Sequence, residues 1–228
     1  MSERKDYFVT GTDTEIGKTL VSCAILYGLV QQGWRSVGMK PVAAGAEWID
    51  GNWCNEDVTA LIAASNVPAD PKLVNPYLFK LAAAPHIAAV QEQCQIEIAM
   101  ILQSFHQLRS VAKAVVVEGV GGFRVPLCAT QDSADLAQQL ALPVVLVVGM
   151  RLGCISAALL TAEAIRARGL RLAGWVANSA QTEMAQLQEN LSALQERLDA
   201  PYLGYIPHLN HPDPGQAFGY LDLSVLFK

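Results

Sequence analysis

The stretch VTGTDTEIGKTL, residues 9–20, decides the fold of this 228-residue chain. It places a glycine-containing loop between an apolar run at 7–10 and a helical pattern over 18–32. The common phosphate-binding loop reads G-x-x-x-x-G-K-[ST]. Here GKT stands at 17–19, but the preceding glycine is Gly11, one position earlier than that pattern requires. Strand, loop and helix in this order still predict a phosphate site, because backbone N–H groups and the helix dipole both attract anions.

Two side chains of the loop are expected to act on a bound triphosphate. Lys18 would neutralise charge on the terminal phosphates, and the Thr19 hydroxyl would bind Mg²⁺. The loop also carries two acids, Asp13 and Glu15, which a longer loop has room to hold. The alternative is an ordinary strand-turn-helix unit with glycines for tight geometry, and Gly-Lys-Thr at this place argues against it.

Beyond the loop, short apolar runs alternate with helical patterns. Further strands are expected at 36–40, 114–119, 143–148, 172–178 and 202–206. Further helices are expected at 95–109, 133–140, 154–168 and 182–198. Most strands are apolar on both faces, which is typical of a parallel sheet covered by helices on each side. We therefore predict an α/β fold with a doubly wound, mostly parallel sheet, in one P-loop NTPase-like domain over 1–228, with the Pro- and Ala-rich stretch 67–86 inserted beside the sheet.

Composition excludes several classes of function. The net charge of -5, without any run of Lys and Arg, argues against a nucleic-acid partner. The longest apolar stretch, 142–150, is too short to span a membrane. Five scattered cysteines without a C-x-x-C pair, and no signal-peptide pattern before the first strand, predict reduced thiols and a cytoplasmic location.

Three charged residues follow or precede expected elements at the carboxyl edge of the sheet. Lys40 ends the second strand before Pro41, so its ammonium could reach the phosphates, or it could be a solvated lysine. Glu118 ends VVVE as in a Walker B element and could hold Mg²⁺, or it could be a turn acid. Asp57 could add a metal contact or cap a helix, and Asn55 could serve equally well as that cap.

The segment RLGCIS at 151–156 opens a helix directly after the most apolar strand. A helix N-terminus behind a glycine is an anion site in principle. Cys154 within it could be a nucleophile, but a small buried thiol is the preferred interpretation. His208 and His211 have a spacing seen in metal sites, yet they lie in a Pro-rich loop with no clear third ligand, so we expect no metal there.

Taken together, the motifs GTDTEIGKT, KPVAAG, NED, VEGVGG, RLGCIS and GWVAN resemble the dethiobiotin synthetase family in their order and spacing. The resemblance covers the chain from Tyr7 to Leu223, and the longer loop is typical of that family. It implies a homodimeric cytoplasmic enzyme that closes the ureido ring of dethiobiotin. The implied substrates are 7,8-diaminononanoate, CO₂ and ATP, with Mg²⁺ as the cofactor.

The resemblance also implies roles for individual residues. Catalysis would fall to Lys18 and Lys40, and the metal would lie among Thr19, Asp57 and Glu118. The implied nucleotide contacts, with Asn178 reading the adenine, are Glu15, Ile16, Gly17, Lys18, Thr19, Leu20, Asp57, Glu118, Gly119, Val120, Gly121, Asn178, Ile206, Pro207 and His208. The implied substrate contacts are Thr12, Ala44, Gly153, Cys154, Ile155 and Ser156.

Two differences from the family pattern lie on the side of the diamine substrate. Ala44 replaces the serine of the usual KPVASG, and Ser156 replaces the asparagine of the usual GCIN. A switch ATPase of the partitioning type is the main alternative, but its second lysine, in K-G-G-x-G-K-[ST], is absent, since Thr12 and Asp13 stand in that part of the loop. An amide-forming ligase of the cobyrinate type would need an added glutaminase domain. A duplicate with a shifted substrate stays open.

Overall fold

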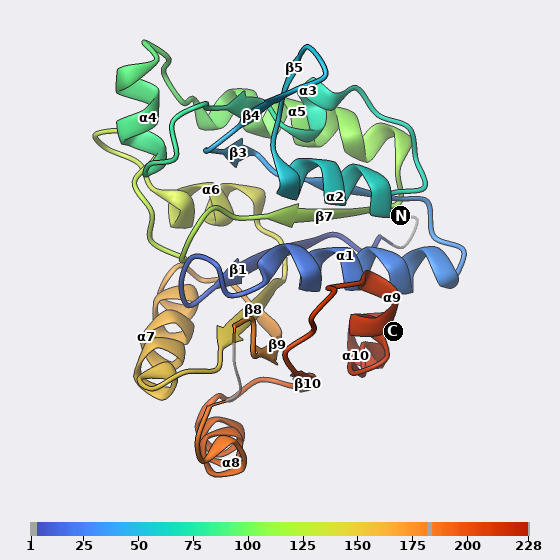
Figure 1. Ribbon diagram of the computed structural model, residues 1–228, viewed down its shortest axis with the longest axis vertical. Coiled ribbons are helices and arrows are strands. Elements are labelled where there is room, and N and C mark those ends of the chain that lie inside the picture. Colours follow the sequence, from blue (N-terminus) through green and yellow to red (C-terminus); the bar gives the residue numbers. More distant parts are fainter. Residues whose placement is uncertain (1–3, 182–183, 228) are drawn as a thin grey trace.

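A six-stranded parallel sheet forms the centre of the computed structural model, which describes residues 4–181 and 184–227 (Figure 1). Its strand order is β10-β9-β8-β1-β7-β2. These strands are β1 (Tyr7–Gly11), β2 (Ser36–Met39), β7 (Ala114–Glu118), β8 (Val144–Gly149), β9 (Leu172–Asn178) and β10 (Tyr202–Ile206). Two small sheets pair β3 (Val42–Ala43) with β6 (Tyr77–Leu78), and β4 (Glu47–Ile49) with β5 (Asn52–Cys54).

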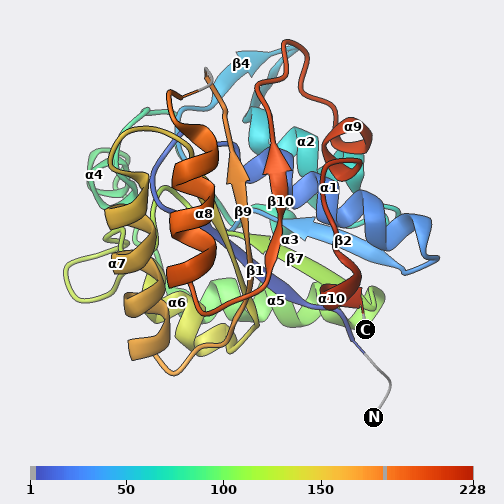
Figure 2. The ribbon, with the colours of Figure 1, turned by 90° about the horizontal axis from the view of Figure 1, so that it is seen from below.

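Helices cover both faces of the sheet, as the fold class requires. On one face lie α1 (Lys18–Gln31), α2 (Glu56–Ala64), α9 (Pro214–Phe218) and α10 (Ser224–Phe227). On the other lie α3 (Pro71–Val74), α4 (Pro85–Gln91), α5 (Ile98–Val111), α6 (Ser133–Leu140), α7 (Cys154–Ala167) and α8 (Leu187–Arg197). Figure 2 shows β9 and β10 between α7 and α8 on one side and α1 and α9 on the other. The expected doubly wound α/β fold is confirmed.

The alternation of side chains along β1 explains why two separate cores form. Phe8 packs on the face that carries α5 to α8, whereas its neighbours Tyr7 and Val9 pack on the face that carries α1. All three side chains are at most 4% exposed. A central parallel strand buries both faces, so it reads as a continuous apolar run in the sequence.

Several element boundaries differ from those expected. Strand β2 stops at Met39 and not at residue 40, because the chain leaves β7 there. The helix expected over 95–109 begins at Ile98 and continues to Val111. Of the helix expected over 182–198, residues 182 and 183 lie outside the described part, and α8 begins only at Leu187.

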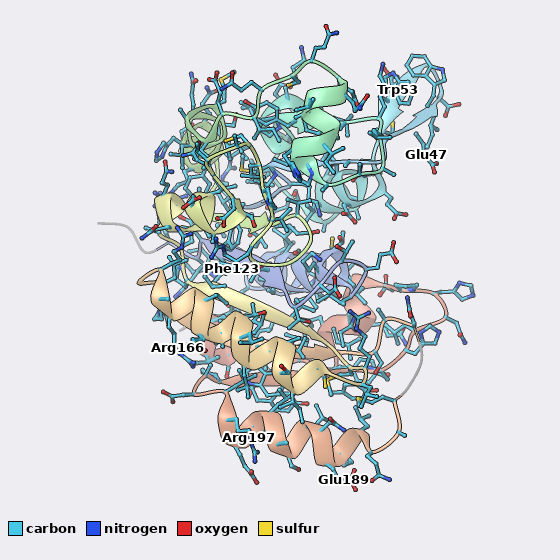
Figure 3. All side chains as sticks on the ribbon, turned by 90° about the vertical axis from the view of Figure 1, so that its left-hand side faces the viewer. Glu47, Trp53, Phe123, Arg166, Glu189 and Arg197 are labelled. Carbon is cyan, nitrogen blue, oxygen red and sulfur yellow. The ribbon has the colours of Figure 1, made fainter. Side chains whose placement is uncertain are left out.

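The region between β2 and α5 contains more structure than the expected insertion. It holds α2, α3 and α4, the β3–β6 pair and the β4–β5 hairpin. In Figure 3 this hairpin, marked by Glu47 and Trp53, stands at the rim of the molecule. The same view shows α7 and α8 side by side, with Arg166 and Arg197 on the same side of the molecule. Among the described residues, no helix combines the length and apolarity needed to cross a bilayer.

Candidate active site

The loop that leads into α1 is fastened to the end of β9. Gly17 precedes the helix with φ 85°, a left-handed conformation that favours glycine. Asn178, the last residue of β9, donates from Nδ2 to the Ile16 carbonyl over 2.7 Å. A Cβ on Gly17 would lie 2.1 Å from that nitrogen, so only glycine fits here. Because glycine has no capping side chain, the N–H groups of the first turn of α1 are available to an anion.

A cavity of about 750 Å³ opens beside this loop. It lies at the carboxyl edge of the sheet, which is where ligands bind in folds of this class. The residues that line it are Thr14, Glu15, Gly17, Lys18, Thr19, Lys40, Ala43, Ala44, Asn55, Glu56, Asp57, Ala82, Ala83, Ala84, Pro85, Glu118, Val120, Gly121, Val125 and Ala180. One part of the wall is therefore charged, and the part formed by 82–85 carries only small apolar side chains.

Four functional groups meet in the charged part of the cavity. The Lys40 Nζ lies 2.5 Å from Glu118 Oε1 and 2.7 Å from Asp57 Oδ2. The Thr19 hydroxyl, which has one proton to donate, lies within hydrogen-bonding distance of the same two carboxylates, with Oγ1 at 2.6 Å from Asp57 Oδ1 and 2.9 Å from Glu118 Oε1. These four groups come from different segments of the sequence. Lys40 and Glu118 lie at the carboxyl ends of β2 and β7, and Thr19 and Asp57 lie at the starts of α1 and α2.

The environment of Lys40 keeps it charged. Burial by itself lowers the pKa of Lys40, but the carboxylates of Glu118 and Asp57 outweigh that effect and raise the pKa above its ordinary value. The pKa of Asp57 is lowered, since the nearby charge and hydrogen bond of Lys40 outweigh the opposite effect of burial. The cluster is thus an ammonium held between two carboxylates.

Lys18 lies in a different electrostatic situation. Its Nζ donates to the Asp13 carbonyl over 2.7 Å and forms part of the cavity wall. Burial, reinforced by the charge of Lys40, lowers the pKa of Lys18 to about 8. A lysine whose charge is this poorly compensated gains more from a bound anion than a solvated lysine does.

The side chains of Thr19, Asp57 and Glu118 can hold a magnesium ion. Glu118 is fully buried, and its Oε2 has no hydrogen-bond partner among the described residues. A buried carboxylate oxygen without a partner is costly unless a cation or water meets it. The described part of the chain has no cluster of three or more His, Cys, Asp and Glu side chains fit for a metal. Two carboxylates and the Thr19 hydroxyl suit Mg²⁺, which usually takes its other ligands from phosphates and water.

A smaller cavity of about 100 Å³ continues past the loop toward Asn178. It shares Thr14 and Glu15 with the larger cavity, and its far side includes Met150 and Arg151. The Arg151 guanidinium forms an ion pair with Asp13 across the loop. Neither charge is buried, so this pair adds little stability but lies over the phosphate loop.

Some residues expected at the site lie elsewhere. Thr12 does not line the larger cavity, because its hydroxyl accepts a hydrogen bond from the Gly149 N–H at 3.3 Å. The segment 153–156 begins α7 and lines neither of the two cavities described above. Ile206 is the last residue of β10, Pro207 and His208 follow it, and the His208 Nδ1 lies 3.1 Å from the Ala180 carbonyl. Leu20 and Gly119 adjoin the lining residues without being part of the wall.

The structure also adds lining residues that the sequence did not indicate. Thr14 lines both cavities, although nothing in the loop pattern distinguishes it from Thr12. The segment 82–85 closes the wall opposite the phosphate loop and was expected only as part of an insertion. Asn55, and not Asp57, caps α2, with its Oδ1 accepting from the Val58 N–H at 3.4 Å. The side chain of Asp57 is thereby left for the cavity.

Comparison with known proteins agrees with this geometry. A family model described as an AAA domain matches residues 5–215. An ATP-dependent dethiobiotin synthetase of Aromatoleum aromaticum is 56% identical over 223 residues, which cover 98% of this chain and 99% of that protein. A second, from Janthinobacterium sp., is 54% identical over 223 residues and 96% of this chain, with 94% of that protein covered.

Solved structures that resemble the chain share its fold at low sequence identity. The MinC:MinD cell division protein complex of Aquifex aeolicus matches with a TM-score of 0.55 and 12% identity, covering 92% of this chain and 83% of that one. A ParA family ATPase of Chlorobium tepidum matches with a TM-score of 0.55 and 14% identity, covering 91% and 85%. These likenesses concern the fold, whereas the sequence relatives identify the family. The chain belongs to the family of ATP-dependent dethiobiotin synthetases.

Proposed function

We propose that this protein is an ATP-dependent cyclo-ligase of biotin biosynthesis, which makes dethiobiotin from 7,8-diaminononanoate, CO₂ and ATP. The observation that carries the proposal is the arrangement of two buried lysines, Lys18 and Lys40, with two carboxylates beside a phosphate loop in one cavity. Such a site suits a reaction in which several anions must be held together. The cavity of about 750 Å³ has room for a small substrate next to the phosphates.

In this reaction the carbon of CO₂ passes through two intermediates, a carbamate and a carbamic–phosphoric anhydride. One substrate amine adds to CO₂ and gives a carbamate, releasing a proton. A carbamate oxygen then attacks the γ-phosphorus of ATP, and ADP leaves. The second amine attacks the carbon of this carbamic–phosphoric anhydride, and phosphate leaves with the electron pair of the broken C–O bond. The attacking nitrogen gives up one proton, which the departing phosphate takes up, and the ureido ring is closed. Lys18 and Lys40 stabilise the negative charge that these anions bring together.

We assign Mg²⁺ to Thr19, Asp57 and Glu118. The unpartnered Oε2 of Glu118 and the two oxygens bound to one ammonium support this assignment. The ion, when bound, neutralises phosphate charge and orients the transferred group. The side chains of the protein position the phosphate loop and exclude water around this loop. Asn178 anchors the loop to β9 and lines the smaller cavity, where we place the adenosine end of ATP.

We further propose that the enzyme is a homodimer. The start of α7, which the family resemblance assigns to the substrate, does not line the cavity of its own chain. Leu152 is 97% exposed beside it, and Leu160 on the same helix is 64% exposed. A second copy that covers these leucines could bring residues 153–156 to the neighbouring cavity. A cytoplasmic location, without nucleic acid or membrane as partner, stays an expectation.

A switch ATPase of the partitioning type is the alternative function. The fold likeness to proteins of that type does not favour it, because the fold alone does not fix function. The alternative predicts ATP turnover driven by a partner protein. A ligase predicts turnover that needs the diamine and bicarbonate.

The test is therefore a reconstituted reaction with purified protein. ATP, Mg²⁺, bicarbonate and 7,8-diaminononanoate are supplied together, and the cyclic urea is detected by mass spectrometry. Omitting the diamine is the control for hydrolysis of ATP without synthesis. We expect one dethiobiotin for each ADP formed. ADP formation that ignores both the diamine and bicarbonate would contradict the proposal.

A further inference from the structure

The chain leaves the main sheet at the residue that carries the catalytic ammonium. Met39 is the last residue of β2 to pair with β7, opposite Val117. Three residues later Val42 pairs with Tyr77 of β6 in a different sheet. Lys40 and Pro41 thus form a junction between two sheets, where the pairing with β7 has ended and the Pro41 carbonyl accepts from the Tyr77 N–H of β6 at 3.2 Å. A backbone carbonyl at such a junction needs a substitute partner if it is buried.

Asn75 supplies that partner. Its Nδ2 donates to the Lys40 carbonyl over 2.6 Å and to the Tyr77 carbonyl over 3.1 Å. The backbone on both sides is joined as well, since the Lys40 N–H donates to the Val74 carbonyl at 2.9 Å. Asn75 is only 9% exposed, and as the residue that ends α3 it donates its own N–H to the carbonyl of Pro71, the first residue of that helix. Its side chain is therefore a fixed bridge between β2 and β6.

We infer that Asn75 is a positioning residue for the reaction, which acts by holding the backbone of Lys40. This inference rests on the proposed function, because Lys40 is the group that Asn75 serves. The Lys40 ammonium must lie between the Glu118 and Asp57 carboxylates and the transferred group, and the peptide that carries it belongs to no continuous strand. The hydrogen bonds from Asn75 restrict the motion that the Lys40 peptide would otherwise have at the end of β2.

The surroundings of Asn75 favour this role over simple core packing. Asn75 also lines a cavity of about 710 Å³ between α2 and α5, behind the active site. An apolar or shorter side chain at position 75 would leave the Lys40 carbonyl facing this space, where water could replace the amide without holding the chain in place. Loss of the bridge should therefore displace the Lys40 ammonium while the protein stays folded.

The chain offers a matched control at the other end of the same strand. Asn66 accepts from the Ser36 N–H at 2.7 Å and donates to the Trp34 carbonyl at 2.9 Å. It also bridges backbone groups next to β2, but at the amino end, away from the cavity. Asn66→Ala removes a bridge at the other end of β2 without touching the junction at Lys40. Asn66 is exposed whereas Asn75 is buried, so kcat is compared per folded protein, and a merely structural role predicts a wild-type kcat for the folded fraction of both variants.

The first test compares turnover of Asn75→Ala, Asn75→Ser and Asn66→Ala. We expect kcat for dethiobiotin to fall about tenfold or more in Asn75→Ala, since small misplacements of a catalytic group cost up to about 10²-fold. The KM for ATP should stay within about twofold, because the phosphate loop is unaffected. Asn66→Ala should keep wild-type kcat. Asn75→Ser, which retains one donor, serves if the alanine variant does not fold, and we expect an intermediate kcat.

The second test is a double-mutant cycle with Lys40→Gln. If Asn75 acts through Lys40, then Asn75→Ala should lower the residual rate of the Lys40→Gln enzyme by less than about twofold. An equal loss in both backgrounds would overturn the inference. So would a folded Asn75→Ala or Asn75→Ser enzyme with wild-type kcat.

A third measurement does not depend on turnover and separates this inference from the proposed function. The rate at which an acylating reagent modifies the buried Lys40 amine can be followed by peptide mass spectrometry. It should rise at least about threefold in Asn75→Ala and stay unchanged in Asn66→Ala, because only the first variant releases the junction. A wild type that makes no dethiobiotin would sink the proposed function alone, whereas unchanged labelling in Asn75→Ala would sink the inference alone.

Discussion

The Lys40 ammonium lies 2.5 Å from the carboxylate of Glu118, and both groups are buried at the end of the central sheet. Asp57 closes the other side of the same ammonium at 2.7 Å. Two carboxylates so close together repel each other unless a cation lies between them. The Lys40 ammonium is the cation that lies between them. Binding of Mg²⁺ to the same carboxylates would leave the ammonium available to the transferred phosphoryl group.

Lys40→Gln should abolish most ring closure and leave ATP binding largely intact. The change removes one oriented donor from the site of developing charge, which typically costs about 10²–10³ in rate. The phosphate loop and Lys18, which contact the nucleotide in our proposal, are untouched. Turnover is measured by mass spectrometry and ATP affinity by calorimetry, with the surface variant Lys72→Gln as the control. Near-normal ring closure in Lys40→Gln would show that the assignment of Lys40 is wrong.

The same substitution should make thermal stability depend on magnesium. Without Lys40, the buried Glu118 and half-exposed Asp57 carboxylates face each other, at a cost of about 3 kcal/mol. For a chain of this length that lowers Tm by about 6–12 °C. Added Mg²⁺ without nucleotide should restore part of the loss in Lys40→Gln and change the wild type less. The test is calorimetry of both proteins with Mg²⁺ or with EDTA. Equal shifts of Tm in the two proteins would contradict a position shared by Mg²⁺ and the Lys40 ammonium.

Gly17→Ala should destroy nucleotide binding, whereas Gly33→Ala should not. Both glycines have positive φ, 85° and 81°, so both substitutions carry a similar backbone strain of about 1 kcal/mol. Only at Gly17 would the new Cβ collide, at 2.1 Å from Asn178 Nδ2, while nothing lies within 4 Å at Gly33. We expect both proteins to fold and only Gly17→Ala to lose ATP affinity in calorimetry. Equal affinities would mean that the contact between the loop and Asn178 is dispensable.

The sequence predicted the sheet well because its strands are short apolar runs, most of them buried on both faces. The strands β9 and β10 have the expected bounds, and so does the helix α6, which Asp132 and Asp135 fix at its start with a capping box. Local signals of this kind suffice for an element and its position. They also suffice for the strand-loop-helix unit around residue 17, whose glycine and lysine each have a local physical reason.

What the sequence could not predict depends on contacts between distant segments. The family resemblance placed Lys40, Asp57 and Glu118 at one site, but the direct ion pairs of Lys40 with both carboxylates follow from strand order, which no local pattern encodes. The wall formed by 82–85 belongs to a stretch of alanines and a proline without periodicity. The bridge from Asn75 needs a junction between two sheets, and the second of these sheets was not expected.

Cys154 should behave as a buried thiol and not as a nucleophile. It is 2% exposed, and burial raises the pKa of its thiol, so the reactive thiolate forms only at more alkaline pH. A backbone hydrogen bond from Thr130 instead lowers the pKa of Cys128, which is less buried. Iodoacetamide near pH 8 should therefore label Cys128 and spare Cys154, as peptide mass spectrometry can show. Cys154→Ala should keep most activity, and a folded but inactive variant would point to covalent catalysis.

Ala44→Ser should tighten binding of the diamine without changing that of ATP. Ala44 lines the larger cavity, and it replaces the serine typical of the family, so in our proposal the reacting end of the substrate would meet a methyl group there. One neutral hydrogen bond contributes about 0.5–1.5 kcal/mol, which corresponds to about threefold to tenfold in affinity. Diamine titrations at saturating ATP and bicarbonate measure the change, and Ala180→Ser, on the nucleotide side of the cavity, is the control. Weaker diamine binding in Ala44→Ser would mean that the pocket around Ala44 is shaped for a different substrate. A hydroxyl added at this position weakens binding when the ligand offers it no hydrogen-bond partner.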